Sequence, residues 1–311
     1  MRSFILILIG LLMSSSLSAL TFQTRLEKVA WQVEGDQFEC RLMQPVTGFG
    51  SGGFVRRAGE SARFQLHAHD PWFSQGSAQL VAAAAPWQPG RTDVTLGQVS
   101  VQSGDKVFTS SFEQAGRLLS GLLEGRSPLV QHRQRYGGGP LEVRLLPVRF
   151  EKAYQDYLGC TAKLLPVNFD QVSQMQLSFT GGDVELSEQA QRNLDHLLIY
   201  LKADPSVNHI QLDGHSDNSG DRLTNRELSR QRALAVQNYL VSKGIPAEQI
   251  TLRFHGERYP LVPNNSKANR AKNRRVTLKA ERVTPQPTPP SAPAGGSPDN
   301  KAAQAHTAAS L

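Results

Sequence analysis

The residues best able to do chemistry lie in one polar turn, "GHSDNSG" (residues 214–220), and in the arginine-rich helix predicted after it. His215, Ser216 and Asp217 are residue types found in hydrolases and metal sites. Asp217 and the later Arg232 could instead hold a ligand that carries both an ammonium and a carboxylate group. A carboxylate side chain binds the first group, and a guanidinium binds the second through two parallel hydrogen bonds.

The spacing does not favour catalysis or metal binding. Neighbours in sequence do not face one another as a serine-hydrolase triad requires, and the chain has no G-x-S-x-G motif. A metal site built from His215, Asp217 and His255 is an alternative, although no helical i, i+4 pair supports it. The stretch "GFGSGG" (48–53) is not followed by a helix-forming segment and is no dinucleotide-binding loop. We therefore expect a protein that is not an enzyme, with no catalytic residue, no cofactor and no metal.

The elements around the turn can bring Asp217 and Arg232 together. A strand is expected over about 208–214 and a helix over about 224–243, which the glycine and proline after residue 243 would end. A loop that curls over the start of this helix would place the acid and the guanidinium in one cleft. The positive end of the helix dipole would add attraction for an anionic group. A plain surface ion pair between the two residues, worth about 0–1 kcal/mol, is the alternative.

Residues 166–283 as a whole alternate strands with helices. Thr224 followed by Glu227 predicts a capping box, in which each side chain satisfies a backbone N–H at the helix start. Ser187 is expected to cap an earlier helix that stops before Pro205. Three further strands are expected around 174–179, 250–254 and 276–280. This order predicts one sheet with helices packed on it.

Residues 20–165 are expected to be mostly strand. Apolar and polar residues alternate over 62–69 and again over 141–145, which is the period of a strand with one wet face. Glycine-rich stretches at 48–53 and 136–140 are expected to break the strands, and one helix is expected near 111–124. The predicted class is therefore α+β with two domains, divided at residues 165 and 166, and the first domain shows no catalytic constellation.

Composition and charge indicate a folded protein with an anionic partner. The chain has 311 residues, of which 39% are hydrophobic and 20% charged, and a formal net charge of +7. Nucleic acid, lipid head groups and acidic cell-wall polymers all suit that charge, although a basic surface also serves solubility. Nucleic acid is disfavoured, because the helix at 224–243 offers only Tyr239 as an aromatic platform.

The two ends of the chain predict export and a tail. A positive start, an apolar run at 4–13 and small residues before position 20 form a secretory signal at residues 1–19, and no cysteine follows for lipid attachment. Cys40 and Cys160 are the only cysteines, so an oxidising compartment would pair them and contribute about 4–5 kcal/mol on the chain-entropy model. Residues 284–311, rich in Pro, Ala, Ser and Gly, are expected to be disordered.

Several ordered motifs of the C-terminal region resemble the peptidoglycan-binding domain of the outer-membrane-protein-A (OmpA) family. They are "GHSDNSG", "NRELSRQRA" (225–233), "KGIPAEQI" (243–250), "GERYP" (256–260) and "NRAKNRRV" (269–276). The resemblance implies an α/β sandwich of β-α-β-α-β type. It also implies a non-enzymatic domain that holds the peptidoglycan stem peptide, chiefly through its diaminopimelate residue.

This resemblance assigns roles to individual residues of the turn and helix. Asp217 would take the ammonium of diaminopimelate and Arg232 its carboxylate. Asn225 matches a frequent polar contact of the pocket, and Ser216 replaces the usual threonine while keeping its hydroxyl group. Two arginines of "NRRV" are expected to support the fold and the wall of the cleft rather than to contact the ligand: Arg274 and Arg275.

The segment "WQVEGDQFECRLMQPVTGFGSGGFVRRAGESARFQL" (31–66) resembles the N-terminal domain of MotY-like periplasmic flagellar motor proteins. Cys40 lies near the start of the first domain and Cys160 near its end, and these positions fit that likeness. The family implies a self-associating ring around the flagellar basal body, with basal-body ring proteins and MotA/MotB-like stator proteins as partners. The implied location is the periplasm of a Gram-negative bacterium, by the peptidoglycan and outer membrane.

Two other functions remain open at this point. The protein could be a general tether between envelope and wall that has no connection with motility. An enzyme acting on the wall is the third class, but it would need a nucleophile or metal that the sequence does not assemble.

Overall fold

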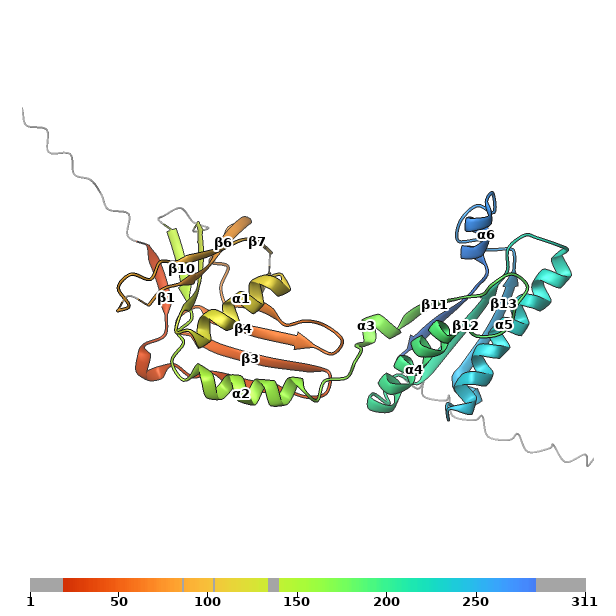
Figure 1. Ribbon diagram of the computed structural model, residues 1–311, viewed down its shortest axis with the longest axis horizontal. Coiled ribbons are helices and arrows are strands. Elements are labelled where there is room, and N and C mark those ends of the chain that lie inside the picture. Colours follow the sequence, from red (N-terminus) through yellow and green to blue (C-terminus); the bar gives the residue numbers. More distant parts are fainter. Residues whose placement is uncertain (1–18, 86, 103, 134–139, 284–311) are drawn as a thin grey trace, which may run out of the picture.

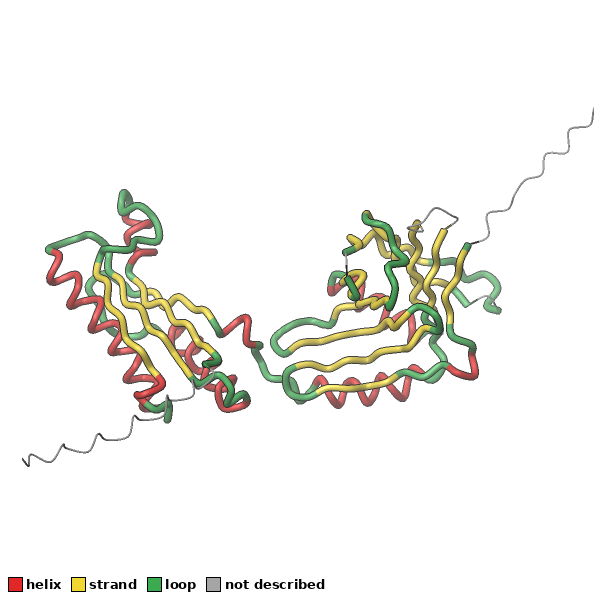
Figure 2. The backbone as a smooth tube through the Cα atoms, turned by 180° about the vertical axis from the view of Figure 1, so that it is seen from behind, coloured by secondary structure: helices red, strands yellow, loops and turns green. Residues whose placement is uncertain are grey.

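The structure is a computed structural model that describes residues 19–85, 87–102, 104–133 and 140–283 (Figure 1). The predicted export signal, apart from Ala19, and the predicted tail at 284–311 lie outside the described residues. Two lobes lie side by side and meet at a narrow waist near the short helix α3, as seen from both sides in Figures 1 and 2. The predicted α+β class, with a β-rich first part and an α/β second part, is confirmed.

The first lobe is built from two five-stranded sheets. One has the order β1-β10-β9-β6-β7 and the other β2-β3-β4-β5-β8. The strands are β1 (Leu20–Gln23), β2 (Gln32–Gly35), β3 (Glu39–Val46), β4 (Gly50–Arg57), β5 (Arg63–Ala68), β6 (Gly76–Ala83), β7 (Val94–Val101), β8 (Lys106–Thr109), β9 (Ser127–Arg133) and β10 (Pro140–Arg144), with a 3-10 turn at Leu26–Lys28. Both strands predicted from alternation, at 62–69 and 141–145, are present as β5 and β10. One apolar cluster that includes Phe54, Leu80 and Val143 fills this lobe.

Two helices complete the first lobe: α1 (Phe112–Leu123) and α2 (Phe150–Thr161). The helix predicted near 111–124 is therefore confirmed, with Ser111 as its cap. Phe112 and Leu123, at its two ends, are 55% and 50% exposed. The buried residues are Gly121 and three with apolar side chains, Ala115, Leu118 and Leu122, which follow one another at three- and four-residue spacing. Helix α2 was not predicted.

The glycine-rich stretch 48–53 breaks the strands only at its start, between β3 and β4. Only residues 47–49 form a turn, and Gly50 to Gly53 lie inside β4. A side chain at Gly53 would overlap the backbone carbonyl of Leu42 on β3, so the glycine allows the two strands to approach. The other predicted break, at 136–140, lies outside the described residues except for Pro140.

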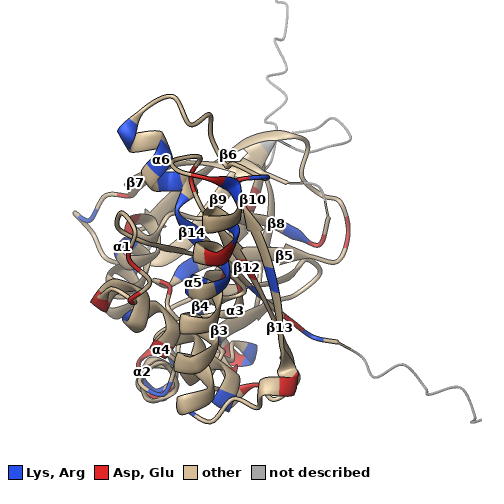
Figure 3. Ribbon diagram, turned by 90° about the vertical axis from the view of Figure 1, so that its right-hand side faces the viewer, with Lys and Arg blue, Asp and Glu red and all other residues tan. Residues whose placement is uncertain are grey.

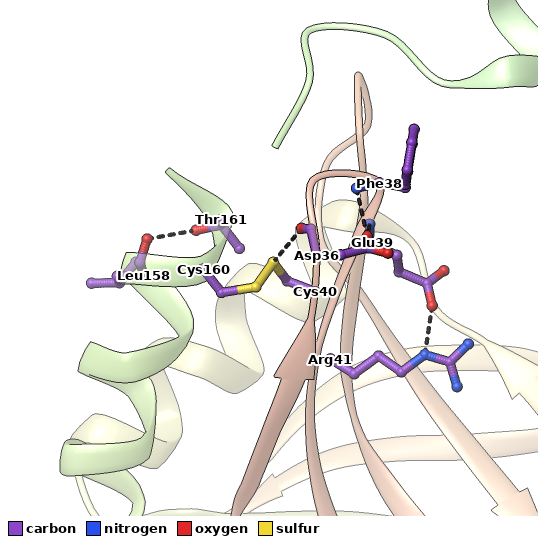
Figure 4. The surroundings of a disulfide bond; sticks show 8 residues. All are labelled: Asp36, Phe38, Glu39, Cys40, Arg41, Leu158, Cys160 and Thr161. Atoms are coloured by element: carbon purple, nitrogen blue, oxygen red, sulfur yellow. Dashed lines mark hydrogen bonds and ion pairs between the residues drawn. A yellow bond between two sulfur atoms is a disulfide. The ribbon is translucent and has the colours of Figure 1, made fainter. Parts of the chain in front are cut away.

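The predicted disulfide is confirmed. Cys40 on β3 is bonded to Cys160 at the end of α2, with the two Cα atoms 6.1 Å apart and 120 positions apart in sequence (Figure 4). Cys40 is fully buried. The bond therefore ties the start of the first lobe to its last helix.

The second lobe is one four-stranded sheet with the order β11-β14-β12-β13. Its elements are α3 (Phe169–Val172), β11 (Gln174–Ser178), α4 (Glu188–Ala203), β12 (His209–His215), α5 (Arg222–Ser242), β13 (Ile250–Gly256), α6 (Lys267–Asn273) and β14 (Arg275–Glu281), with a 3-10 turn at Ala247–Gln249. Strands β12 and β13 are parallel and are joined through α5, whereas β14 is antiparallel to β11 and β12. Leu194, Leu197, Leu212, Val236 and Leu278 belong to its core.

Helix α5 begins two residues earlier than predicted, and its cap is a different residue. Asp221 is the N-cap, and its carboxylate accepts hydrogen bonds from the backbone N–H groups of Leu223 and Thr224. The predicted Thr224–Glu227 capping box is therefore wrong, since Thr224 already lies inside the helix. The predicted end is right: Gly244 has φ +98°, and the N–H of Ile245 reaches back to the carbonyl of Leu240.

Candidate functional site

Asp217 lies in the loop between the end of β12 and the start of α5, with both carboxylate oxygens engaged. One accepts the backbone N–H of Ser219 at 2.9 Å, and the other accepts Arg274 Nη1 at 2.7 Å. Burial by itself raises the pKa of Asp217, but the hydrogen bonds from Arg274 and Ser219 outweigh it, and the net pKa is lowered. Asp217 is therefore a buried carboxylate that is ionised at neutral pH.

Arg232 lies in α5, nearly three turns after its first residue, Arg222, and is completely buried, with 0% exposure. Its Nε donates to the carbonyl of Asp183 at 2.9 Å, its Nη2 donates to that of Gly181 at 2.7 Å, and its guanidinium carbon lies 5.2 Å from the ring centre of Phe179. Within the described part of the chain, its Nη1 has no hydrogen-bond partner. Burial, with the positive charge of Arg274, lowers the pKa of Arg232 to about 10, so the side chain stays charged at neutral pH.

Phe179 and Arg274 connect the two predicted site residues, Asp217 and Arg232. The Nε of Arg274 donates to the backbone carbonyl of Phe179 at 3.2 Å, and the ring of the same Phe179 lies beside Arg232. Asp217 forms its ion pair with Arg274 rather than with Arg232. Arg274, predicted only to support the cleft, thus contacts the acid directly, and neither Phe179 nor the acid–Arg274 pair was predicted.

Asn225 and Ser216 are two further buried polar residues of this region. Asn225, in the first turns of α5, is 3% exposed and donates from Nδ2 to Glu257 at 2.7 Å. The backbone N–H of Ser216 donates to the carbonyl of Gly256 at 2.9 Å, whereas its hydroxyl is buried with no partner among the described residues. Glu257 was not singled out from the sequence, because nothing in its spacing indicates that it meets Asn225.

Arg275 has a different role from its neighbour Arg274. It begins β14, is 7% exposed, and donates to the carbonyls of Tyr259 and Asn273 at 3.3 and 3.4 Å. Asn273 is fully buried and bonds the backbone of Leu261 and Val262. Together these residues hold the loop after β13.

The histidines of this region are not arranged as a serine-hydrolase triad or a metal site would require. His215 stacks on His255 with ring centres 5.0 Å apart, and His255 is bonded to Asp213 at 2.7 Å. Neither His215 Nδ1 nor the hydroxyl of Ser216 has a partner in the described ranges, so these two atoms do not bond each other. The same ranges contain no group of three or more His, Cys, Asp or Glu side chains placed to hold a metal ion. Burial, with the charges of Arg275 and His255, lowers the pKa of His215 to about 4.

Basic side chains surround this end of the second lobe. Figure 3 shows lysine and arginine residues on α6, and the helix carries Lys267, Arg270 and Lys272. Because Lys267 and Lys272 are exposed and Arg270 is partly exposed, this surface is suited to an anionic polymer rather than to a neutral one. The arrangement as a whole offers one ionised acid, one buried guanidinium with a free N–H group, and a basic rim.

Comparison with known proteins gives both lobes a family. Residues 22–166 match the MotY N-terminal domain and residues 178–274 match the OmpA family. The chain is 24% identical over 257 residues to the sodium-type flagellar protein MotY of Vibrio parahaemolyticus, which covers 81% of this chain and 87% of that protein. It is 39% identical over 95 residues to the peptidoglycan-associated lipoprotein of Pseudomonas putida, covering 30% of this chain and 56% of the lipoprotein.

The crystal structure of the peptidoglycan-associated lipoprotein from Burkholderia pseudomallei is also similar, at 28% identity. It covers 34% of this chain and 89% of that chain, with a TM-score of 0.33. The fold and the family matches define the class: this is a two-domain protein with an OmpA-family domain after a MotY N-terminal domain. The chain is accordingly a homologue of the flagellar motor protein MotY.

None of the helices in the described ranges has the length and apolar character needed to cross a membrane.

Proposed function

We propose that this protein is a non-catalytic component of the bacterial flagellar motor that binds peptidoglycan in the periplasm. Its first domain, up to about residue 165, associates with the basal body as part of a ring of several copies. Its second domain, from about residue 166 to 283, binds the wall, and the two together hold MotA/MotB-like stator units in place. The homology with MotY and the OmpA-family domain support this proposal.

The observation that carries the wall-binding part is the buried Arg232 with an unpartnered Nη1 near the ionised Asp217. A buried donor without a partner destabilises the free protein by about 1–3 kcal/mol, so a ligand that accepts its hydrogen bond recovers this loss. The side chain of diaminopimelate ends in an ammonium and a carboxylate on the same carbon. The carboxylate would accept from Arg232, and the ammonium would lie against Asp217.

The surrounding residues take the roles that their positions allow. Asn225 and Ser216 add polar contacts to the ligand, since both are buried polar residues and Ser216 is the chain neighbour of the acid. Arg274 holds Asp217 ionised and in place, and Arg275 holds the loop that forms the wall of the site. This assignment needs no metal, cofactor or nucleophile.

Sedimentation with purified peptidoglycan tests this site. Asp217→Asn keeps the shape of the side chain and removes its charge, and Arg232→Lys keeps a charge and removes the planar fork. We expect each to weaken binding by roughly tenfold or more, because a charge-assisted hydrogen bond is lost. Arg230→Ala is the matched control, as Arg230 lies on the same helix but is exposed and paired with Glu227. Circular dichroism melts establish that each variant is folded.

The chemistry of the wall provides a second arm of the test. Peptidoglycan with lysine in place of diaminopimelate lacks the side-chain carboxylate, so the wild-type protein should prefer the diaminopimelate form. The Arg232→Lys variant should lose most of that preference. If folded Asp217 and Arg232 variants sediment with the wall as well as wild type does, the site is assigned wrongly.

The motor role is tested in cells. Deleting the gene should leave flagella assembled in normal number while swimming is impaired, because stator units are no longer held. Normal swimming in such a strain would instead favour a general tether between envelope and wall. The proteins that co-purify with residues 20–165 would separate the two: basal-body proteins support the motor role, and their absence opposes it.

A further inference from the structure

The segment between the two domains is held by hydrogen bonds on both sides, unlike an ordinary linker. The N–H of Leu165 donates to the carbonyl of Gln37 at 2.9 Å, and its carbonyl accepts the N–H of Gly59 at 3.2 Å. Gln37 and Gly59 lie in two different hairpin turns of the first domain, after β2 and β4. The chain thus leaves the first domain clamped between these turns. The next residues, 167–177, lie between the ranges that match the two families.

Helix α3 grips the same turn through its own capping residues. Asn168 caps α3 with its carbonyl oxygen, which leaves its amide nitrogen free to donate to the carbonyl of Ala58 at 3.0 Å and to Glu60 at 2.8 Å. Gln171, the other half of the capping box, donates to the carbonyl of Gly59 at 3.2 Å. Asn168 is 4% exposed, and its bond to the carbonyl of Ala58 is buried. A helix that packs on the second domain is therefore bonded to the first.

Aromatic side chains from both domains meet on α4. Tyr200 of α4 is 4% exposed, and its ring centre lies 5.6 Å from that of Phe38 and 5.7 Å from that of Phe169. Phe38 belongs to the β2–β3 turn of the first domain, yet it packs against the core of the second. Arg282 lies over the ring of Phe169, with its guanidinium carbon 4.0 Å from the ring centre. It also forms an ion pair with Asp204 at 2.7 Å.

The disulfide anchors both chain segments that enter this contact. Cys40 follows Phe38 by two positions, and Cys160 precedes Leu165 by five. Figure 4 shows the bond joining the end of α2 to the hairpin whose turn carries Phe38. The backbone of that turn is fixed further by Asp36, whose carboxylate accepts the N–H groups of Phe38 and Glu39. The disulfide thus joins, within a few residues, the two segments of the first domain that lead into the contact.

We infer that residues 36–40, 57–60 and 165–173, with Tyr200 and Arg282, form a rigid joint that fixes the orientation of the two domains. Domains joined by an exposed linker move relative to each other by default. Here three of the connecting residues, Val167, Asn168 and Val172, are buried, and the segment is hydrogen-bonded to the turns of the first domain. The consequence rests on the proposed function: the peptidoglycan site, at the other end of β12, would be held at a set position from the motor-associated domain, so that load passes between them without slack.

A double variant, Phe38→Ala with Asn168→Ser, separates the joint from the folding of either domain. Serine still caps α3, so only the two bonds from the amide nitrogen of Asn168 are lost. Removing the Phe38 ring takes away the aromatic contact made by the first domain. Phe112→Ala is the control, because Phe112 is an exposed phenylalanine of the first domain outside the joint.

The measurements are ¹⁵N relaxation and hydrogen exchange on the mature chain. In the wild-type protein both domains should tumble with one correlation time, and amides of 165–173 should be protected. In the double variant the two correlation times should diverge, and exchange in this segment should accelerate by roughly tenfold or more. Independent tumbling in the wild-type protein, or unchanged exchange in the variant, would overturn the inference.

Gly59→Ala gives an independent perturbation of the same joint. Gly59 has φ +68°, and a Cβ there would lie 2.9 Å from both the Pro166 carbonyl oxygen and the Val167 Cα. Gly90→Ala is matched to it, since Gly90 has φ +83° with nothing within 4 Å of an added Cβ. Only Gly59→Ala should uncouple the domains. Both variants should still sediment with peptidoglycan, which distinguishes a failed joint from a failed wall-binding site.

Discussion

Removing the disulfide should destabilise the first domain far more than the second. The bond closes a segment of 120 positions, so the chain-entropy model gives a loss of about 5 kcal/mol when both cysteines are replaced. Alanine is the better replacement, because Cys40 is fully buried and a serine hydroxyl there would add an unrelated burial penalty. The test is therefore the variant Cys40→Ala/Cys160→Ala.

This loss converts into a measurable shift of the melting temperature. For a domain of this size, each kcal/mol lowers Tm by roughly 2–4 °C, so the transition of the first domain should fall by roughly 10–20 °C. Scanning calorimetry resolves it, and sedimentation with peptidoglycan at 25 °C reports whether the second domain remains folded. That domain has its own apolar core and should bind as before.

The reasoning fails in two recognisable ways. A shift of under about 3 °C would mean that the unfolded chain is not much constrained by the bond, contrary to the loop-closure argument. Loss of peptidoglycan binding at 25 °C would mean that the second domain depends on the first for its fold, contrary to the separation of the two cores.

Three further predictions concern the second domain. Histidine has a pKa near 6.5 in the unfolded chain, whereas the pKa of His215 in the folded protein is lowered to about 4. Stability should therefore fall by up to about 3 kcal/mol as the pH drops from 6.5 to 4. The variant His215→Gln should remove this pH dependence in urea titrations. Gly214→Ala should destabilise the domain by about 2 kcal/mol or more, since the new Cβ overlaps a backbone carbonyl of α5, while Gly182→Ala meets nothing within 4 Å and should not; equal denaturation midpoints would refute this. Asp221→Ala should cost about 1 kcal/mol as the loss of the α5 cap, and Thr224→Ala clearly less; the reverse order would restore the capping box predicted from the sequence.

The elements of the second domain were largely predictable because their signals are local. Apolar residues at strand and helix spacing, a serine before α4 and a glycine after α5 each act on neighbouring residues. The start of α5 was misjudged for the same reason: both Asp221 and Thr224 can cap, and the choice depends on where the loop from β12 arrives. Helix α2 was missed because its polar composition carries no strong apolar stripe; Phe150, Ala153 and Tyr157 are its buried face.

The contacts of the site could not be predicted, because they join residues distant in sequence. Nothing near Asp217 indicates that Arg274, 57 positions later, would bond it. Phe179 looked like an ordinary strand residue, yet its carbonyl holds one arginine and its ring lies beside another. Sequence spacing indicated Asp217 and Arg232 as a candidate pair. The structure shows that Asp217 forms its ion pair with a second arginine, Arg274, instead.

A buried arginine is the strongest physical indication of function in this chain. Stability alone would favour an apolar residue in that position of α5, because burying a guanidinium with an unpartnered N–H group lowers stability unless something accepts the bond. The hydroxyl of Ser216 and Nδ1 of His215 are left unpartnered in the same region of the described chain. Deficits of this kind collect where a ligand is to be bound, since local folding rules are broken mainly at functional sites. The joint near α3 shows the opposite character: there the side-chain amides of Asn168, which is buried, and of Gln171 are bonded within the chain. Under the proposed function, a ligand accepts the free N–H group of Arg232 at one end of the second domain, whereas at the other end the bonds of Asn168 and Gln171 are made within the chain.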